Sequence, residues 1–191
     1  MTINPRAQTP ALKIDTLDGG QFDIAAMKPK TFTMIVFYRG VHCGFCRRYL
    51  QELDTLVDDF RDIGVEVVAV SCDDKDRAEK SRREWDLKNF PIGYGMSLEK
   101  AAEWGLFIST GILDDQPDYF SESGLVLVEP DGALHCSYVQ SWPFARPRLA
   151  DIRDAIVFAT DRKKPARGEI TTMSQEILSG PAAAKRQSAA E

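Results

Sequence analysis

The sequence has few of the residues that mark disulfide scaffolds, membrane spans or polyanion-binding proteins. Its 191 residues include only four cysteines, too few for a disulfide-stapled fold. No apolar run approaches the roughly 18 residues of a spanning helix, and residues 1–10 are polar where a signal peptide would be apolar. Basic and acidic side chains number 24 and 29 without any long block of like charge. We therefore expect a cytoplasmic protein with no nucleic-acid or membrane partner.

Size and composition fit one globular domain followed by a tail. Apolar residues make up 43% of the chain, which is long enough to bury a core without covalent staples. After Arg162 the sequence becomes rich in Lys, Pro, Ala, Ser and Gln, a composition that does not support a packed core. We predict a folded domain over residues 1–165 and a C-terminal tail over residues 166–191.

Hydrophobic periodicity predicts an α/β fold. Residues 31–38 are almost continuously apolar, as in a central strand. Apolar residues then recur every three or four positions over 46–63, as on one helix face, before a second buried strand at 65–70. We also predict a hairpin at a sheet edge (11–24), a charged surface helix (73–87), a short strand after Phe90, a helix (97–106), a long loop (107–122), a β-hairpin (124–139) and a final helix (149–159). This order predicts a mixed sheet of about five to seven strands with helices on both faces.

The most informative segment is Cys43-Gly44-Phe45-Cys46, which stands where the strand over 31–38 passes into the following helix. Open α/β sheets bind ligands at this carboxyl edge. The free N–H groups and positive dipole end of a helix favour a thiolate, and can lower a cysteine pKa from about 8.5 to roughly 3.5–7.5. Thiolates attack disulfides and peroxides, so the pair indicates redox chemistry.

The positions of the two cysteines suggest different roles. Cys43 falls in the last non-helical turn and is expected to be the exposed attacking nucleophile. Cys46 lies one turn inside, at the head of the apolar stripe, and is expected to be the buried resolving thiol that closes a Cys43–Cys46 disulfide. Arg39 and His42 are candidate substrate-binding residues whose charge would favour the thiolate. The alternative for His42 is a solvent-exposed loop position.

The cysteines and histidines could also form a metal site or serve packing alone. Zinc usually needs two ligands besides a C-x-x-C pair, and the only candidates are Cys72, Cys136, His42 and His135, with no second paired motif. We therefore expect no metal; a packed, inert pair is a further alternative. Cys72 follows the strand over 65–70 and is either a core residue or a distant redox partner. His135 and Cys136 are adjacent on a strand, so they point to opposite faces and are assigned to packing.

A resemblance to a known family is carried by Phe37-Tyr38-Arg39-Gly40, by Cys43-Gly44-Phe45-Cys46-Arg47 and by Tyr49-Leu50. These segments resemble the peroxiredoxin-like branch of the alkyl hydroperoxide reductase/thiol-specific antioxidant (AhpC/TSA) group. The similarity spans about residues 10–160, including VVAVSCDD and GLVLVEPDG. It implies a thioredoxin-like fold with an N-terminal β-hairpin extension, and an antioxidant or thiol oxidoreductase activity.

The sequence departs from the pattern of that group at several positions. Peroxidatic sites of the group usually read P-x-x-x-T-x-x-C after an aromatic pair. In that alignment Cys46 occupies the peroxidatic position, Cys43 replaces the threonine and Arg39 replaces the proline. Ser123 stands where peroxiredoxins carry an arginine and thioredoxins a cis-proline. The chain thus combines a thioredoxin-type dithiol with a peroxiredoxin-like frame.

Three functional hypotheses follow. The first is a thiol-disulfide oxidoreductase with an antioxidant role that cycles through a Cys43–Cys46 disulfide. The second is a thiol peroxidase with Cys46 peroxidatic and Cys43 resolving. The third is a non-catalytic thioredoxin-like binding module. The first two imply a protein or small-molecule disulfide, or a hydroperoxide, as substrate, a dithiol electron donor and no bound cofactor. A homodimer is possible, with the loop over 107–122 or the tail at its interface.

Overall fold

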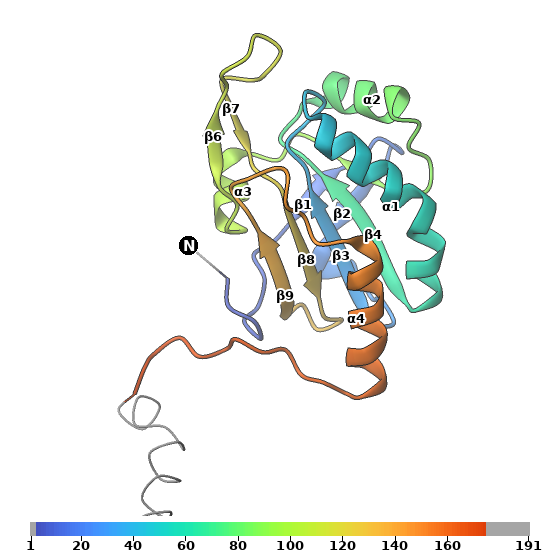
Figure 1. Cartoon of the computed structure of the whole chain (residues 1–191), viewed down its shortest axis with the longest axis vertical. Helices are drawn as coiled ribbons and strands as arrows, with labels where there is room; N and C mark the ends of the chain where they lie inside the picture. Colours follow the sequence, from blue (N-terminus) through green and yellow to red (C-terminus); the bar gives the residue numbers. More distant parts are fainter. Residues whose placement is uncertain (1–2, 175–191) are drawn as a thin grey trace, which may run out of the picture.

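The computed structural model describes residues 3–174 and contains a five-stranded mixed sheet (Figure 1). In spatial order its strands are β5 (Ile92–Gly93), β4 (Val65–Val70), β3 (Phe32–Phe37), β8 (Gly124–Val128) and β9 (Leu134–Val139). The first three strands are mutually parallel, β8 is antiparallel to β3, and β9 is antiparallel to β8. The predicted mixed sheet with a central strand after residue 30 is confirmed.

The parallel unit β3–α1–β4 determines where the C-x-x-C segment lies. Every residue of β3 is buried, and in β4 only Glu66 is exposed, as expected for apolar strands covered on both faces. Helix α1 (Gly44–Asp62) joins the two strands and packs Leu50, Leu53 and Phe60 into the core. Because α1 begins seven positions after the end of β3, the first turn of the helix stands at the carboxyl edge of the sheet.

Helices and a hairpin cover the two faces of the sheet. Helix α4 (Leu149–Asp161) packs beside α1 and shares its core cluster. On the opposite face lie the hairpin of β1 (Lys13–Asp15) and β2 (Gln21–Asp23), the short 3-10 helix η1 (Ile24–Ala26) and helix α3 (Leu98–Glu103). The hairpin forms a two-stranded sheet of its own, and a single bridge from Thr16 to Gly93 places it beside the edge strand β5. The N-terminal β-hairpin extension is therefore confirmed.

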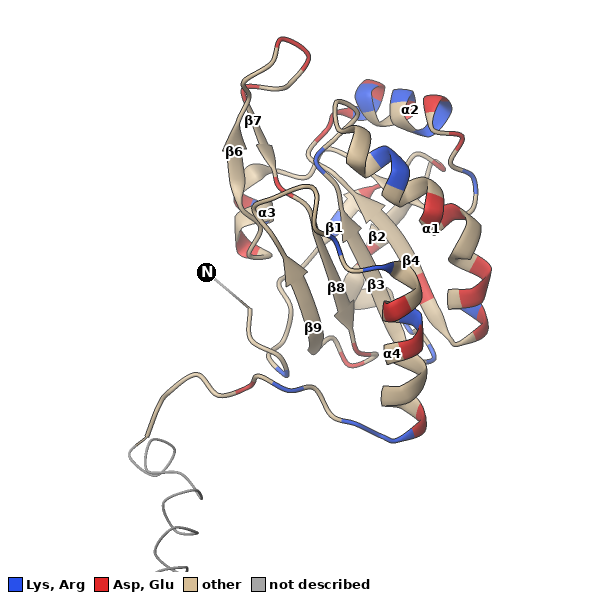
Figure 2. Cartoon of the chain, in the orientation of Figure 1, with Lys and Arg blue, Asp and Glu red and all other residues tan. Residues whose placement is uncertain are grey.

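Charged residues lie mainly on the outer helices. Figure 2 shows basic and acidic residues interspersed along helix α2 (Lys75–Glu84), whereas the strands of the five-stranded sheet contain a single Asp, Glu, Lys or Arg residue, Glu66. Only Ala78 and Ser81 of α2 are buried, so this helix lies on the surface as its composition predicts. No helix within residues 3–174 is long and apolar enough to cross a membrane.

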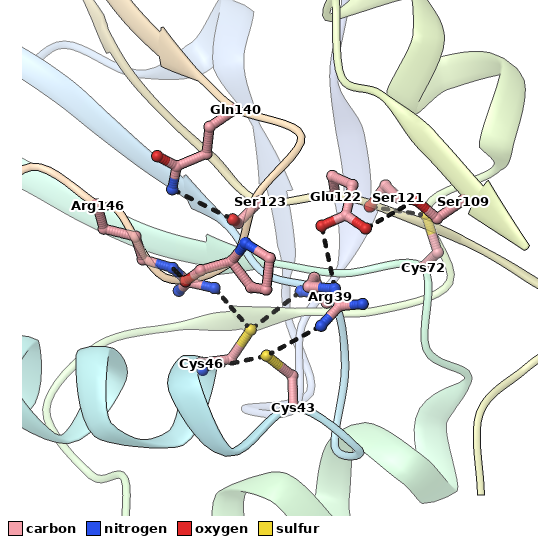
Figure 3. Close-up of polar contacts among 11 residues, drawn as sticks. Arg39, Cys43, Cys46, Cys72, Ser109, Ser121, Glu122, Ser123, Gln140 and Arg146 are labelled. Atoms are coloured by element: carbon pink, nitrogen blue, oxygen red, sulfur yellow. Dashed lines mark hydrogen bonds and ion pairs between the residues drawn. The ribbon is translucent and has the colours of Figure 1, made fainter. Parts of the chain in front are cut away.

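The segment over residues 107–122 differs from the prediction of a long loop. It contains strands β6 (Ile108–Thr110) and β7 (Tyr119–Ser121), which pair antiparallel, and only the connection between them is irregular. Three residues are too short for an alternating pattern to stand out, and two of the three residues of β6 are exposed. The pairing places Glu122, the residue after β7, beside Arg39 in the loop that leads to the C-x-x-C segment (Figure 3).

The end of the described chain contacts its beginning. Arg6 Nε donates a hydrogen bond to the carbonyl oxygen of Ala166 at 2.8 Å, and Arg6 Nη1 lies 3.1 Å from Glu169 Oε1. Residues 175–191 lie outside the described part of the chain. The division into a domain over 1–165 and a tail over 166–191 therefore stays a prediction.

Candidate active site

A buried carboxylate shapes the loop between β3 and α1. The backbone N–H of Val41 donates to Asp73 Oδ2 at 2.8 Å, and Arg77 Nε lies 3.0 Å from Asp73 Oδ1. Gly40 has a φ of +130°, and a Cβ at this position would lie 2.6 Å from Asp73 Oδ1. Only glycine fits this turn without strain. The turn brings Cys43 to the start of α1.

Cys43 is the N-cap of α1, and its sulfur faces a set of hydrogen-bond donors (Figure 3). Its Sγ accepts a hydrogen bond from the backbone N–H of Cys46 at 3.3 Å, and Arg39 Nη1 lies 3.8 Å away. The pKa of the Cys43 thiol is lowered to about 5, chiefly by the hydrogen bond from the Cys46 thiol. The Cys46 N–H and Arg39 add to this effect, and burial opposes it. Cys43 is therefore ionised at neutral pH.

Cys46 lies one turn inside the helix and is completely buried. Its Sγ accepts hydrogen bonds from the backbone N–H of Arg39 at 3.3 Å and from Arg146 Nη2 at 3.1 Å. Burial raises the pKa of the Cys46 thiol well above its ordinary value, and the hydrogen bond to the Cys43 sulfur raises it further. One thiolate and one thiol thus share a proton, and the thiolate is on Cys43.

The expected solvent exposure of Cys43 is wrong. Only 3% of its surface is accessible, so both cysteines are buried, although Cys46 is the more buried of the two as predicted. The reason is that Arg39 and Arg146, which come from two different loops, both lie against the sulfurs (Figure 3). The two cysteines are close to each other but not bonded.

The two predicted substrate-binding residues are placed differently. Arg39 points toward Cys43, and its Nε lies 3.1 Å from Glu122 Oε2. His42 turns away, because its ring packs on Phe120 with centroids 4.8 Å apart and its Nδ1 lies 3.4 Å from Arg77 Nη2. The pKa of His42 is lowered, chiefly by burial. Arg39 therefore lies against the Cys43 sulfur, whereas His42 contacts Phe120 and Arg77 beside the site.

Sequence reasoning missed Arg146. This residue lies in the loop between β9 and α4, a hundred positions from Cys46, in a segment without hydrophobic period. Its guanidinium also lies over the Tyr49 ring, 5.3 Å from the centroid. Ser123, which stands at the position of the family arginine, instead accepts a hydrogen bond from Gln140 Nε2 at 3.5 Å. Arg146 thus supplies a guanidinium that the family pattern places elsewhere in the chain.

The remaining cysteines and the second histidine lie apart from the pair. Burial raises the pKa of Cys72, whose Sγ donates to Ser121 Oγ at 3.5 Å, and burial raises the pKa of Cys136 to about 11. His135 Nδ1 lies 2.9 Å from Glu129 Oε1. Within residues 3–174 no group of three or more His, Cys, Asp or Glu side chains is arranged to hold a metal ion.

Comparison with known proteins identifies the family. The model of the AhpC/TSA family matches residues 5–136. The chain belongs to the AhpC/TSA family. No curated protein matches it.

Solved peroxiredoxin structures share the fold at low sequence identity. The chain is similar to a mutant of Peroxiredoxin 6 of Arenicola marina, with 16% identity, a TM-score of 0.70, and coverage of 93% of this chain and 88% of that one. A reduced 2-Cys peroxiredoxin of Plasmodium vivax matches with 17% identity, a TM-score of 0.66, and coverage of 84% and 99%. A peroxiredoxin-like protein from Aquifex aeolicus matches with 12% identity, a TM-score of 0.68, and coverage of 83% and 88%.

These findings confirm the predicted thioredoxin-like fold and the resemblance stated above. Family membership also confirms that this AhpC/TSA protein is a thiol-dependent oxidoreductase. The third hypothesis, a non-catalytic binding module, is set aside for this reason. The choice of attacking cysteine depends on the site itself.

Proposed function

We propose that the chain is a thiol-disulfide oxidoreductase in which the Cys43 thiolate attacks the oxidised substrate and Cys46 resolves the intermediate. The observation that carries this proposal is the placement of Cys43 Sγ at the start of α1. This sulfur accepts a hydrogen bond from the backbone N–H of Cys46 and faces the Arg39 guanidinium. These groups hold the pKa of Cys43 at about 5 while the pKa of Cys46 is raised. At neutral pH the nucleophile is therefore Cys43.

The reaction of a disulfide substrate balances in two steps. The Cys43 thiolate attacks one substrate sulfur, forms a mixed disulfide and releases the other sulfur as a thiolate. Cys46 then loses its proton and attacks Cys43, which forms the Cys43–Cys46 disulfide and releases the second substrate thiol. A dithiol electron donor returns the two electrons and restores the reduced pair. No bound cofactor takes part.

The first step prepares Cys46 for the second. Two of the interactions that raise the pKa of Cys46 are its hydrogen bond to the Cys43 sulfur and the charge of the Cys43 thiolate. Both are lost when Cys43 enters the mixed disulfide, whereas Arg146 and the Arg39 N–H still face Cys46. The Cys46 thiolate therefore becomes easier to form at the stage where it is needed.

The burial of the pair restricts the substrate. The sulfur of a cysteine residue that is only 3% exposed is reached more easily by a small molecule than by a disulfide held in a folded protein. We therefore favour small oxidised substrates, namely a small-molecule disulfide or a hydroperoxide. We also propose a cytoplasmic location, where a reducing environment would return a dithiol pair of this kind to its reduced form.

A thiol peroxidase with Cys46 as the attacking residue is the second candidate. It is favoured by the two N–H donors on Cys46 Sγ, from Arg39 and Arg146, and by the position of Cys46 in the family pattern. In that reaction Cys46 attacks the peroxide, becomes a sulfenic acid and releases water or an alcohol. Cys43 then attacks the sulfenic sulfur, releases water and forms the same disulfide.

A parallel kinetic assay tests the substrate class. The purified protein is supplied with a dithiol reductant and tested on oxidised glutathione, hydrogen peroxide and an organic hydroperoxide, with the Cys43→Ser/Cys46→Ser double variant as control. We expect the wild-type protein to turn over at least one of these small substrates, and the double variant to turn over none of them. Equal rates for the two proteins on all three substrates would contradict the proposal. Size-exclusion chromatography of the same samples distinguishes a homodimer from a monomer.

A further inference from the structure

Two contacts hold the Arg39 guanidinium next to Cys43. Its Nε lies 3.1 Å from Glu122 Oε2, and its Cζ lies 4.7 Å from the centroid of the Phe120 ring. Its Nη1 then lies 3.8 Å from Cys43 Sγ (Figure 3). A guanidinium is planar and rigid, so contacts on one edge and one face also determine where the remaining N–H groups point.

Glu122 is itself firmly placed. Its side chain is only 4% exposed, its Oε1 accepts a hydrogen bond from Ser109 Oγ at 2.7 Å, and its backbone N–H donates to the carbonyl of Phe107 at 2.7 Å. A buried carboxylate is costly unless it is paired, and among the described residues its cationic partner is Arg39. The pairing of β6 and β7 therefore fixes the position of Glu122, and Glu122 in turn fixes the position of Arg39.

We propose that Glu122 is a positioning residue for Cys43, because it holds the Arg39 guanidinium so that Nη1 faces the Cys43 sulfur. This inference rests on the proposed function in which Cys43 attacks. The charged and titratable groups that face Cys43 are Arg39 from the loop after β3, Cys46 from α1 and Arg146 from the loop after β9. Glu122 acts on the sulfur through Arg39.

The charge of Glu122 and its role in positioning Arg39 have opposite effects on the stability of the Cys43 thiolate. The negative charge partly offsets the charge of Arg39 and so opposes the Cys43 thiolate, whereas the ion pair keeps Arg39 in place and favours it. Glu122→Asp keeps the charge but shortens the side chain by one methylene. Glu122→Gln keeps the length and an oxygen that can face Arg39 but removes the charge. The two variants therefore separate positioning from charge.

The test is the rate at which iodoacetamide alkylates Cys43 in the reduced full-length protein between pH 4 and pH 8. Peptide mass spectrometry assigns the label to Cys43 or Cys46. Since the pKa of Cys43 is about 5, half of the sulfur is thiolate at pH 5. Release of Arg39 in Glu122→Asp is expected to raise this pKa by about one unit, which lowers the rate at pH 5 roughly fivefold. Glu122→Gln is expected to react at least as fast as the wild type.

Two further proteins complete the design. Arg39→Met removes the group through which Glu122 acts, so Arg39→Met/Glu122→Asp should react at the same rate as Arg39→Met alone. Glu129→Gln changes a carboxylate that pairs with His135 away from the sulfurs, and it should leave the profile unchanged. Circular dichroism checks that every variant is folded.

The possible outcomes decide between distinct explanations. An unchanged Glu122→Asp profile, equal losses in Glu122→Asp and Glu122→Gln, or a further loss in the double variant would each overturn the positioning role. If Cys46 is labelled first in the wild type at low pH, the proposed function fails as well. If Cys43 is labelled first in the wild type but the Glu122→Asp profile is unchanged, the proposed function stands and the inference about Glu122 is wrong.

Discussion

The ionised Cys43 links the stability of the reduced protein to pH. The pKa of Cys43 is about 5 in the folded protein and about 8.5 in an unfolded chain. Because the folded pKa is the lower one, the stabilisation is complete above the unfolded value and is lost as the pH falls through about 5. Between pH 6 and pH 8 the unfolded state holds about one proton more, so the free energy of unfolding rises by about 1.4 kcal/mol per pH unit from this group.

The assay is urea denaturation at pH 6, 7 and 8 in a phosphine reductant that keeps the pair reduced. Cys43→Ser removes the titrating group but leaves a good helix N-cap. The difference in free energy of unfolding between wild type and Cys43→Ser should grow by roughly 2–3 kcal/mol from pH 6 to pH 8. Contributions from groups that do not interact with Cys43 are common to both proteins and cancel in the difference. Cys46 stays neutral in Cys43→Ser as well, because burial, the largest cause of its raised pKa, remains.

Cys72→Ser is the matched control, because it removes a cysteine whose pKa is raised by burial and which is therefore neutral in both states over this range. Its stability should run parallel to that of the wild type. If the curve of Cys43→Ser also runs parallel to the wild type, the reduced protein contains no Cys43 thiolate and the electrostatic reasoning is wrong.

Two further predictions concern the fold around the site. Phe60→Ala should cost roughly 3–5 kcal/mol in urea denaturation because the ring is fully buried on the α1 face, whereas the exposed Arg83→Ala should stay within about 0.5 kcal/mol; equal effects would mean that the helix faces the sheet differently. Gly40→Ala should lower the free energy of unfolding by about 1–3 kcal/mol, seen as a lower melting temperature, because the φ of residue 40 is +130° and the new Cβ would clash with Asp73. Gly44→Ala, which meets nothing within 4 Å, should not, and a matching loss there would contradict this explanation.

Local patterns in the sequence were sufficient to predict the unit that carries the cysteines. The apolar run of β3 and the helical period of α1 depend on nearest-neighbour properties of the backbone, so they predict the strand, the helix and the placement of Cys43 at their junction. The greater burial of Cys46 relative to Cys43 follows from the same period.

Contacts between distant segments could not be predicted in this way. Arg146 reaches Cys46 from a loop a hundred positions away, and Glu122 reaches Arg39 only because β6 and β7 pair. Neither residue lies in a periodic segment, since side-chain contacts across loops leave no local pattern. The burial of Cys43 was missed for the same reason, because the side chains against it come from other segments.

The central claim, that Cys43 attacks and Cys46 resolves, is tested most directly by mass spectrometry of the two single variants after one equivalent of oxidant. With oxidised glutathione, Cys46→Ser should trap a stable mixed disulfide on Cys43, and Cys43→Ser should not react. With hydrogen peroxide, the sulfenic acid should form on Cys43 of Cys46→Ser. Rapid formation of a sulfenic acid on Cys46 of Cys43→Ser, with Cys46→Ser inert, would contradict the account and make Cys46 the attacking residue.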